Sequence, residues 1–177
     1  LLIKNILANP TRIGFFEVMK NMGAGIEWKN MKKIAGEWVG DVHVFYRPLN
    51  GLQVDGAIIP SVIDEIPIIA VLATQADTPT IIDGANELRV KESDRIKAIC
   101  HNLKAMGTDI IERKNGFIIN PSTPLRHANI TTFGDHRIAM AFSIAGLLTS
   151  NKNKLDDVDC INISFPEFHQ ILNQICQ

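Results

Sequence analysis

The segment Glu87-Leu88-Arg89-Val90-Lys91-Glu92-Ser93-Asp94-Arg95 contains six charged residues of both signs and leads directly into an amphipathic helical pattern. A second polar segment, Asp135-His136-Arg137, opens an apolar helical pattern further along the chain. A helix start carries partial positive charge and unpaired backbone N–H groups, so it favours small anions. We therefore expect these two helix starts to form a site that binds anions and moves protons.

Helical patterns of two kinds alternate along the chain. Three amphipathic patterns each follow a capping residue, and two patterns are apolar nearly all round, which is typical of helices buried on every side. The amphipathic patterns cover residues 13–22, 96–106 and 165–175, after Asn9, Asp94 and Ser164, and the apolar patterns cover 66–73 and 138–148. Strand patterns cover residues 2–7, 42–46, 80–82, 109–112, 116–119 and 130–132.

The repeating unit is helix, strand, strand, helix, strand, and repeated units usually stack side by side in one orientation. We therefore predict an α/β (α+β) fold of repeated units, with buried parallel helices and surrounding sheets. Parallel packing would bring several helix starts to one face of the molecule. That face would attract anions although the net charge of the chain is only −1.

Composition narrows the class of function. The 177 residues are 46% hydrophobic, enough to fill a real core. A net charge of −1 gives no general attraction to nucleic acid or to an anionic membrane, and no apolar run approaches the roughly 20 residues of a membrane span. Three cysteines without disulfide or zinc spacing favour a reduced, cytoplasmic compartment. The chain begins without Met and within a strand pattern, so we expect a part of a longer protein.

Three residues of the first polar segment could carry chemistry. Arg95 can clamp a carboxylate or a phosphate through two parallel hydrogen bonds. Lys91 can hold an anionic oxygen or pass a proton, and Glu92, placed near cations, could act as a general acid or base. The alternative is a capped helix with a salt-bridged surface loop, and charge pattern alone favours that alternative.

Polar residues at the starts of the two apolar helices complete the candidate site. Arg137 lies in the first turn of a buried helix and needs an anionic partner, which could be Asp135, Glu92 or a bound ligand. Asp135 and Asp64 are each placed to cap the helix that follows. No glycine-rich loop of the Walker or dinucleotide type occurs, and the remaining histidines lack the spacing of metal ligands.

Four motifs of the chain resemble those of the EPSP synthase (3-phosphoshikimate 1-carboxyvinyltransferase) family. They are Asn9-Pro10-Thr11-Arg12, Ile63-Asp64-Glu65-Ile66-Pro67, the nine-residue segment Glu87 to Arg95, and Asp135-His136-Arg137-Ile138-Ala139-Met140. A fifth, Ser164-Phe165-Pro166-Glu167-Phe168, is similar to the start of the family's last helix. The resemblance implies one lobe of the enolpyruvyl transferase fold, with residues 1–177 as the C-terminal lobe and the N-terminal lobe missing.

The resemblance also implies an activity. The family transfers the enolpyruvyl group of phosphoenolpyruvate to the 5-hydroxyl of shikimate 3-phosphate and releases phosphate, in the shikimate pathway to chorismate and the aromatic amino acids. No metal or organic cofactor is implied. The implied partners are the two substrates and the missing N-terminal lobe, without which the chain alone is expected to be inactive.

The family's functional residues carry over by position. Asp64 should contact the shikimate hydroxyls and help take the proton of the attacking hydroxyl, and Lys91 should lie at that reacting hydroxyl. Glu92 should give a proton to the methylene carbon of phosphoenolpyruvate and later take it back. Arg95 and Arg137 should clamp the carboxylate of phosphoenolpyruvate.

Two positions depart from the family pattern, and two rival interpretations stay open. Ile163 stands where many members have a phosphate-contacting Lys, and Glu87 stands where some have Asn. Both departures resemble the divergent bacterial branch that includes glyphosate-tolerant enzymes. One rival is the UDP-N-acetylglucosamine enolpyruvyl transferase, against which the Lys-Glu-Ser-Asp-Arg and Asp-His-Arg motifs argue. The other is a non-catalytic anion-binding module, against which the intact set of site residues argues.

Overall fold

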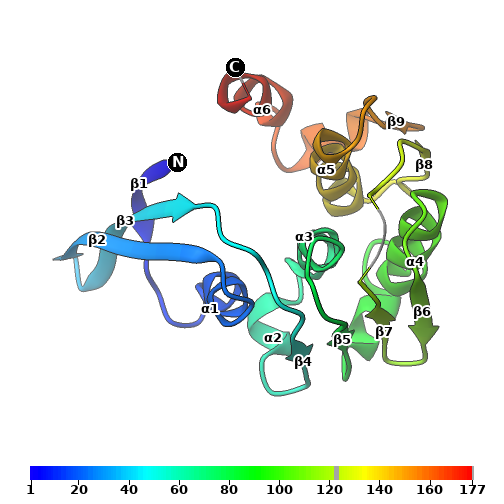
Figure 1. Ribbon diagram of the computed structural model, residues 1–177. Coiled ribbons are helices and arrows are strands. Elements are labelled where there is room, and N and C mark those ends of the chain that lie inside the picture. Colours follow the sequence, from blue (N-terminus) through cyan, green and yellow to red (C-terminus); the bar gives the residue numbers. More distant parts are fainter. Residues whose placement is uncertain (122–123, 177) are drawn as a thin grey trace.

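The computed structural model describes residues 1–121 and 124–176, which form helices alternating with three small sheets (Figure 1). None of the helices in these two ranges is long and apolar enough to cross a membrane. The buried helix α3 lies between the elements of the first part of the chain and those of the second part (Figure 1).

The first repeat runs from an amphipathic helix through a hairpin to a buried helix. Its elements are α1 (Gly14–Asn21), β2 (Gly25–Ile34), β3 (Glu37–Phe45), β4 (Gln53–Val54), α2 (Ile59–Val62), α3 (Ile66–Ala73) and β5 (Thr80–Ile82). The first strand of the chain, β1 (Leu2–Leu7), pairs antiparallel with β3, so that this sheet has the order β1-β3-β2. The short strands β4 and β5, on either side of α3 in the sequence, pair parallel to each other.

The second repeat follows the same order after the short 3-10 helix η1 (Asn86–Val90). Its elements are α4 (Arg95–Ala105), β6 (Ile110–Arg113), β7 (Gly116–Ile119), β8 (Asn129–Ile130), α5 (His136–Ala145), η2 (Gly146–Leu148) and β9 (Lys154–Leu155). Strands β8 and β9 pair parallel around α5, as β4 and β5 do around α3. Strand β7 pairs with β5, which joins the two repeats in one sheet of order β4-β5-β7-β6. The chain continues through η3 (Asp159–Ile163) to α6 (Phe168–Ile175).

The two apolar helices form the centre of the core, as their sequence pattern predicts. Every residue of α3 and of α5 is buried or half-buried, and both helices contact α4 as well as each other. Fully burying one large aliphatic or aromatic side chain stabilises a fold by about 1.5–3 kcal/mol. Burial of the apolar surfaces of α3 and α5 therefore stabilises the packing of the two repeats against each other. Helix α6 differs, because Phe168 is its one buried residue.

Two residues that the sequence predicts as helix caps, Asn9 and Ser164, do not cap a helix in the structure. The side chain of Asn9 accepts hydrogen bonds from the backbone N and the Oγ1 of Thr11, which closes a turn ahead of α1. Helix α1 itself begins at Gly14 without a side-chain cap, and α6 begins at Phe168, four residues after Ser164. Short polar side chains offer the backbone local turns as well as caps, so a cap signal alone does not fix the first residue of a helix.

Candidate active site

Helices α3, α4 and α5 begin at one place in the molecule. The Nη1 atom of Arg95, the first residue of α4, lies 3.1 Å from Oδ1 of Asp64, just before α3. The Nε atom of the same guanidinium lies 2.8 Å from Oδ2 of Asp135, the N-cap of α5. The expectation that helix starts of the two repeats meet on one face is therefore confirmed for α3, α4 and α5.

Arg95 is the central residue of this cluster. Its side chain is completely buried, and a third carboxylate, that of Glu92, accepts a hydrogen bond from its Nη2 atom at 2.5 Å. Removing a partner from a buried ion pair is costly because it leaves a charge uncompensated in a poorly polarisable environment. The three carboxylates Asp64, Glu92 and Asp135 therefore explain how a fully buried guanidinium is tolerated.

Arg137 lies on the outer side of the same cluster. Its Nη2 atom is 3.1 Å from Oδ2 of Asp64, and its Nη1 atom donates to the backbone carbonyl of Asp64 at 3.2 Å. The side chains of Arg137 and Asp64 are each 33% exposed, so both are accessible from solvent. The carboxylate of Asp64 thus bridges the two guanidiniums. The anionic partner of Arg137 within the chain is Asp64, so the prediction that Asp135 or Glu92 pairs with Arg137 is wrong.

Two of the three helix starts are already capped by carboxylates of the chain. Asp94 accepts a hydrogen bond from the backbone N of Lys97 in α4, and Asp135 accepts two from the first turn of α5. The predicted capping role of Asp135 is confirmed. The predicted capping role of Asp64 is wrong, because Glu65 is the N-cap residue of α3 and Asp64 turns toward the two arginines instead. Anion binding at this face would consequently depend on side chains more than on free backbone N–H groups.

The burial of the cluster shifts the pKa of its groups in opposite directions. Burial alone would raise the pKa of Asp135, but the hydrogen bond and charge of Arg95 outweigh burial and hold that pKa below its usual value. For Glu65 burial wins, so its pKa lies above the usual value although Arg137 acts against the shift. Burial also acts to lower the pKa of Arg95, but Asp135, Glu92 and Asp64 raise it overall.

The predicted catalytic residues Lys91 and Glu92 lie at the exposed edge of the cluster. Lys91 is exposed, and its side chain makes no ion pair or hydrogen bond within residues 1–121 and 124–176. The side chain of Glu92 is 51% exposed, so it can leave Arg95 without crossing the core. Of the five predicted site residues, Asp64, Glu92, Arg95 and Arg137 are joined by direct contacts, and Lys91 stands beside them in sequence.

Arg89, a third cation of the same segment, has a structural position. It forms ion pairs with Asp94 at 2.8 Å and with Glu112 at 3.0 Å. It also donates to the backbone carbonyls of Arg113 and Lys114 in the β6–β7 hairpin. These bonds connect the start of α4 to the hairpin. For Arg89, the alternative interpretation of a salt-bridged surface loop is therefore correct.

A cavity of about 210 Å³ opens beside Asp64 and Arg137. Met140, Ile144, Phe165 and Phe168 supply much of its apolar wall. Glu65 also lines this cavity, although the sequence pattern predicts no role for it there. In the sequence, an acidic residue next to a helix start is explained by its interaction with the helix dipole. The position of Glu65 in the wall of a cavity is visible only in the structure.

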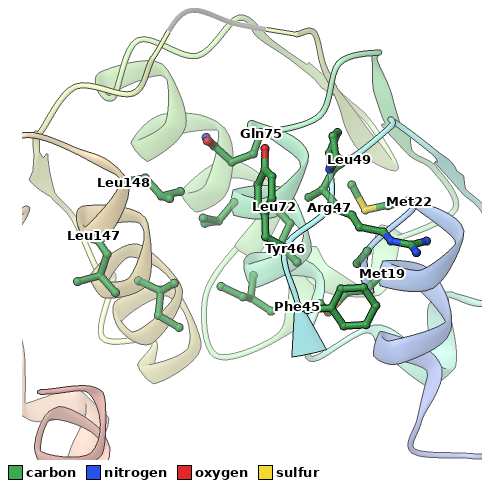
Figure 2. A pocket seen from close by; sticks show the side chains of 15 residues that line it. Met19, Met22, Phe45, Tyr46, Arg47, Leu49, Leu72, Gln75, Leu147 and Leu148 are labelled. Carbon is green, nitrogen blue, oxygen red and sulfur yellow. The ribbon is translucent and has the colours of Figure 1, made fainter. Parts of the chain in front are cut away.

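A larger cavity of about 420 Å³ lies at the opposite ends of α3 and α5 (Figure 2). Its lining is mainly apolar, with Leu72, Leu147 and Leu148 on one side and Met19, Met22 and Phe45 on the other (Figure 2). It contains none of the predicted site residues. Within the part of the chain that the structure describes, no group of three or more His, Cys, Asp or Glu residues could hold a metal ion.

Comparisons with known proteins point to one family. The family model for EPSP synthase (3-phosphoshikimate 1-carboxyvinyltransferase) matches residues 1–172. The 3-phosphoshikimate 1-carboxyvinyltransferase of Sulfurihydrogenibium sp. (strain YO3AOP1) is 45% identical over 173 residues, covering 98% of this chain and 40% of the relative. The chain thus spans about two fifths of the length of the curated relatives it matches.

Solved structures agree with the sequence comparisons. The structure of EPSP synthase from Acinetobacter baumannii superposes with a TM-score of 0.92 at 36% identity, over 98% of this chain and 41% of that one. The enolpyruvyl transferase NikO from Streptomyces tendae superposes with a TM-score of 0.66 over 92% of this chain and 35% of its own, at 18% identity. The second likeness concerns the fold alone, and it confirms the predicted α/β architecture of the enolpyruvyl transferases.

Proposed function

The chain belongs to the EPSP synthase family, and on that premise we propose that it is the C-terminal lobe of a 3-phosphoshikimate 1-carboxyvinyltransferase. The whole enzyme would transfer the enolpyruvyl group of phosphoenolpyruvate to shikimate 3-phosphate and release phosphate. The observation that carries this proposal is the contact network of Asp64, Glu92, Arg95 and Arg137 at three converging helix starts. The lobe would work together with a second lobe, in the cytoplasm, and with no cofactor.

Arg137 is the group best placed to receive the carboxylate of phosphoenolpyruvate. It is partly exposed, it borders the cavity of about 210 Å³, and it contacts Asp64 through one hydrogen bond and one ion pair. A guanidinium has five N–H donors, so donors remain for an incoming carboxylate. The cluster holds three carboxylates against two guanidiniums, so further positive charge from the other lobe would be required for tight binding of anions.

Arg95 would take part only after a rearrangement. Because its side chain has no exposed surface, a substrate carboxylate can reach Nη2 only by displacing Glu92. The displaced Glu92 would then be free to turn toward the substrate. Binding of the substrate carboxylate to Arg95 would thus also release Glu92, the proposed catalytic acid, toward the substrate.

The chemistry follows from these positions. The 5-hydroxyl of shikimate 3-phosphate adds to C2 of phosphoenolpyruvate while Glu92 protonates the methylene carbon, which gives a tetrahedral intermediate. Asp64, with one carboxylate oxygen on each arginine, would accept hydrogen bonds from the shikimate hydroxyls and help remove the attacking proton. Lys91 would lie at the reacting hydroxyl. Return of a methyl proton to Glu92 and departure of phosphate then form the enol ether of the product.

The test is reconstitution of a complete site. The chain is mixed with a separately produced fragment covering the rest of the Sulfurihydrogenibium relative, and phosphate release is followed with both substrates present. We expect release only when both polypeptides and both substrates are present. In the reconstituted enzyme, Glu92→Gln should lower turnover by about 10²–10⁴-fold, the usual contribution of a positioned acid or base. Near-normal turnover of that variant would refute the role of Glu92.

A further inference from the structure

Glu65 carries a half-buried carboxylate that pairs with no cationic side chain of the described residues. It is the N-cap residue of α3 but makes no capping hydrogen bond, and it forms no ion pair within residues 1–121 and 124–176. Its side chain lines the same cavity as Asp64 and Arg137. A buried or half-buried carboxylate is normally paired, so an unpaired one beside an anion site calls for a functional explanation.

The charges that face Glu65 come from three parts of the fold. Arg137 approaches from α5, Arg12 from the segment before α1, and Asp64 from the same loop as Glu65. The first residue of α6, Phe168, and Phe165 in the segment before it contribute apolar rings to this cavity and no charge. Glu65 thus acts electrostatically on Arg137 and Arg12, at distances longer than an ion pair.

We propose that Glu65 determines how strongly Arg137 binds anions at the cavity of about 210 Å³. The negative charge of Glu65 would repel the incoming anion. This inference rests on the proposed function, because it concerns the same anion-binding arginine. Arg137 is held in place by Asp64, which forms an ion pair with its Nη2 atom and accepts a hydrogen bond from its Nη1 atom at the backbone carbonyl. Loss of the Glu65 charge should therefore leave Arg137 oriented and strengthen its attraction for an anion.

The size of the effect follows from Coulomb's law. Two like charges several ångströms apart in a partly buried site repel enough to change an affinity roughly tenfold. The same charge makes the affinity depend on pH. Burial raises the pKa of Glu65, and Arg137 partly offsets that shift. As the pH falls toward the raised pKa, Glu65 is neutralised, and anions should bind more tightly through the loss of this repulsion.

Two variants of the chain separate charge from shape. Glu65→Gln removes the charge and keeps the length of the side chain, whereas Glu65→Asp keeps the charge. Glu17→Gln, on the exposed surface of α1, controls for the change in net charge. Binding of phosphoenolpyruvate and of inorganic phosphate is measured by calorimetry at low salt from pH 5.5 to 8, with thermal melting to show that each variant is folded.

The expected result is that Glu65→Gln binds phosphoenolpyruvate about tenfold more tightly than the unsubstituted chain at pH 8, with a smaller increase on acidification. Glu65→Asp and Glu17→Gln should bind like the unsubstituted chain. Equal or weaker binding by a folded Glu65→Gln variant, including no detectable binding, overturns the inference. If Arg137→Ala then still lowers binding, only the inference about Glu65 has failed. If Arg137→Ala changes nothing, the assignment of Arg137 in the proposed function has failed as well.

Discussion

The Nε atom of Arg95 lies 2.8 Å from Oδ2 of Asp135, and both side chains are completely buried. The two residues are 40 positions apart and begin different helices, so this one bond fixes the start of α4 against the start of α5. Asp135 also accepts a hydrogen bond from Ser93 and from the first turn of α5. A single carboxylate therefore serves as helix cap, counter-ion and spacer between two elements of the site.

Replacing Asp135 by Ala should destabilise the chain strongly. The change leaves the Arg95 guanidinium without its completely buried carboxylate partner, and breaking a buried pair in this way costs about 3–5 kcal/mol. Urea denaturation followed by circular dichroism measures the free energy of unfolding. The exposed Asp159 provides a matched control, because Asp159→Ala should cost less than about 0.5 kcal/mol. Equal losses in the two variants would contradict the central position of the pair.

The stability of the chain should fall in acid through the same carboxylate. Because the pKa of Asp135 is lowered in the folded state, this residue adds stability above the usual Asp value of 3.8. That contribution is lost as the pH falls through the lowered pKa, where the folded state must also take up the proton. Unfolding free energies between pH 7 and pH 2 should show this loss. A folded Asp135→Asn variant should show a shallower decline, and parallel curves would contradict the prediction.

Arg89→Ala should weaken the fold and spare the site. The variant loses the bonds from Arg89 to Asp94 and Glu112 and to two carbonyls of the β6–β7 hairpin, for a total of about 1–3 kcal/mol. Denaturation by urea measures this loss, while calorimetric titration with phosphoenolpyruvate should give an affinity equal to that of the unsubstituted chain. A large drop in affinity would place Arg89 among the binding residues instead.

Gly116→Ala should disrupt the sheet that joins the two repeats. An added Cβ would lie 1.9 Å from the carbonyl oxygen of Ile82, so strand β5 would have to move away from β7. Overpacking of this kind costs about 1–3 kcal/mol or more. Gly56→Ala is the matched control, because a Cβ there meets nothing within 4 Å. Thermal melting of both variants tests the difference, and similar midpoints would contradict the packing described for Gly116.

Much of the architecture follows from the sequence because its strongest signals are long and periodic. Helices α3 and α5 are apolar all round, and no location except the core suits such segments. Strand β2 was missed because it is largely exposed and rich in Lys, which hides the alternation of a strand. Strands β4 and β9 have two residues each, too short for any period to be visible.

The sequence predicted that Asp64, Arg95 and Arg137 would meet, but it did not predict the contacts between them. The position of Arg95 and Arg137 at helix starts indicated the meeting place, but not that Asp64 bridges both arginines. A residue that can cap a helix can also form an ion pair, and the choice between them depends on neighbours distant in sequence. Glu65 shows the same limit, because the role proposed for it depends on a cavity whose walls come from three separate segments.

The most direct test of the proposed site at the starts of α3, α4 and α5 uses nuclear magnetic resonance. It locates where phosphoenolpyruvate binds on the isotopically labelled chain. The account predicts that the largest shifts of backbone amide signals occur at the first turns of α4 and α5, and at Asp64 and Glu65. Signals from Leu147 and Leu148, beside the apolar cavity at the opposite helix ends, should stay unchanged (Figure 2). Shifts confined to that apolar cavity, or no shifts at the helix starts at saturating ligand, would contradict the account.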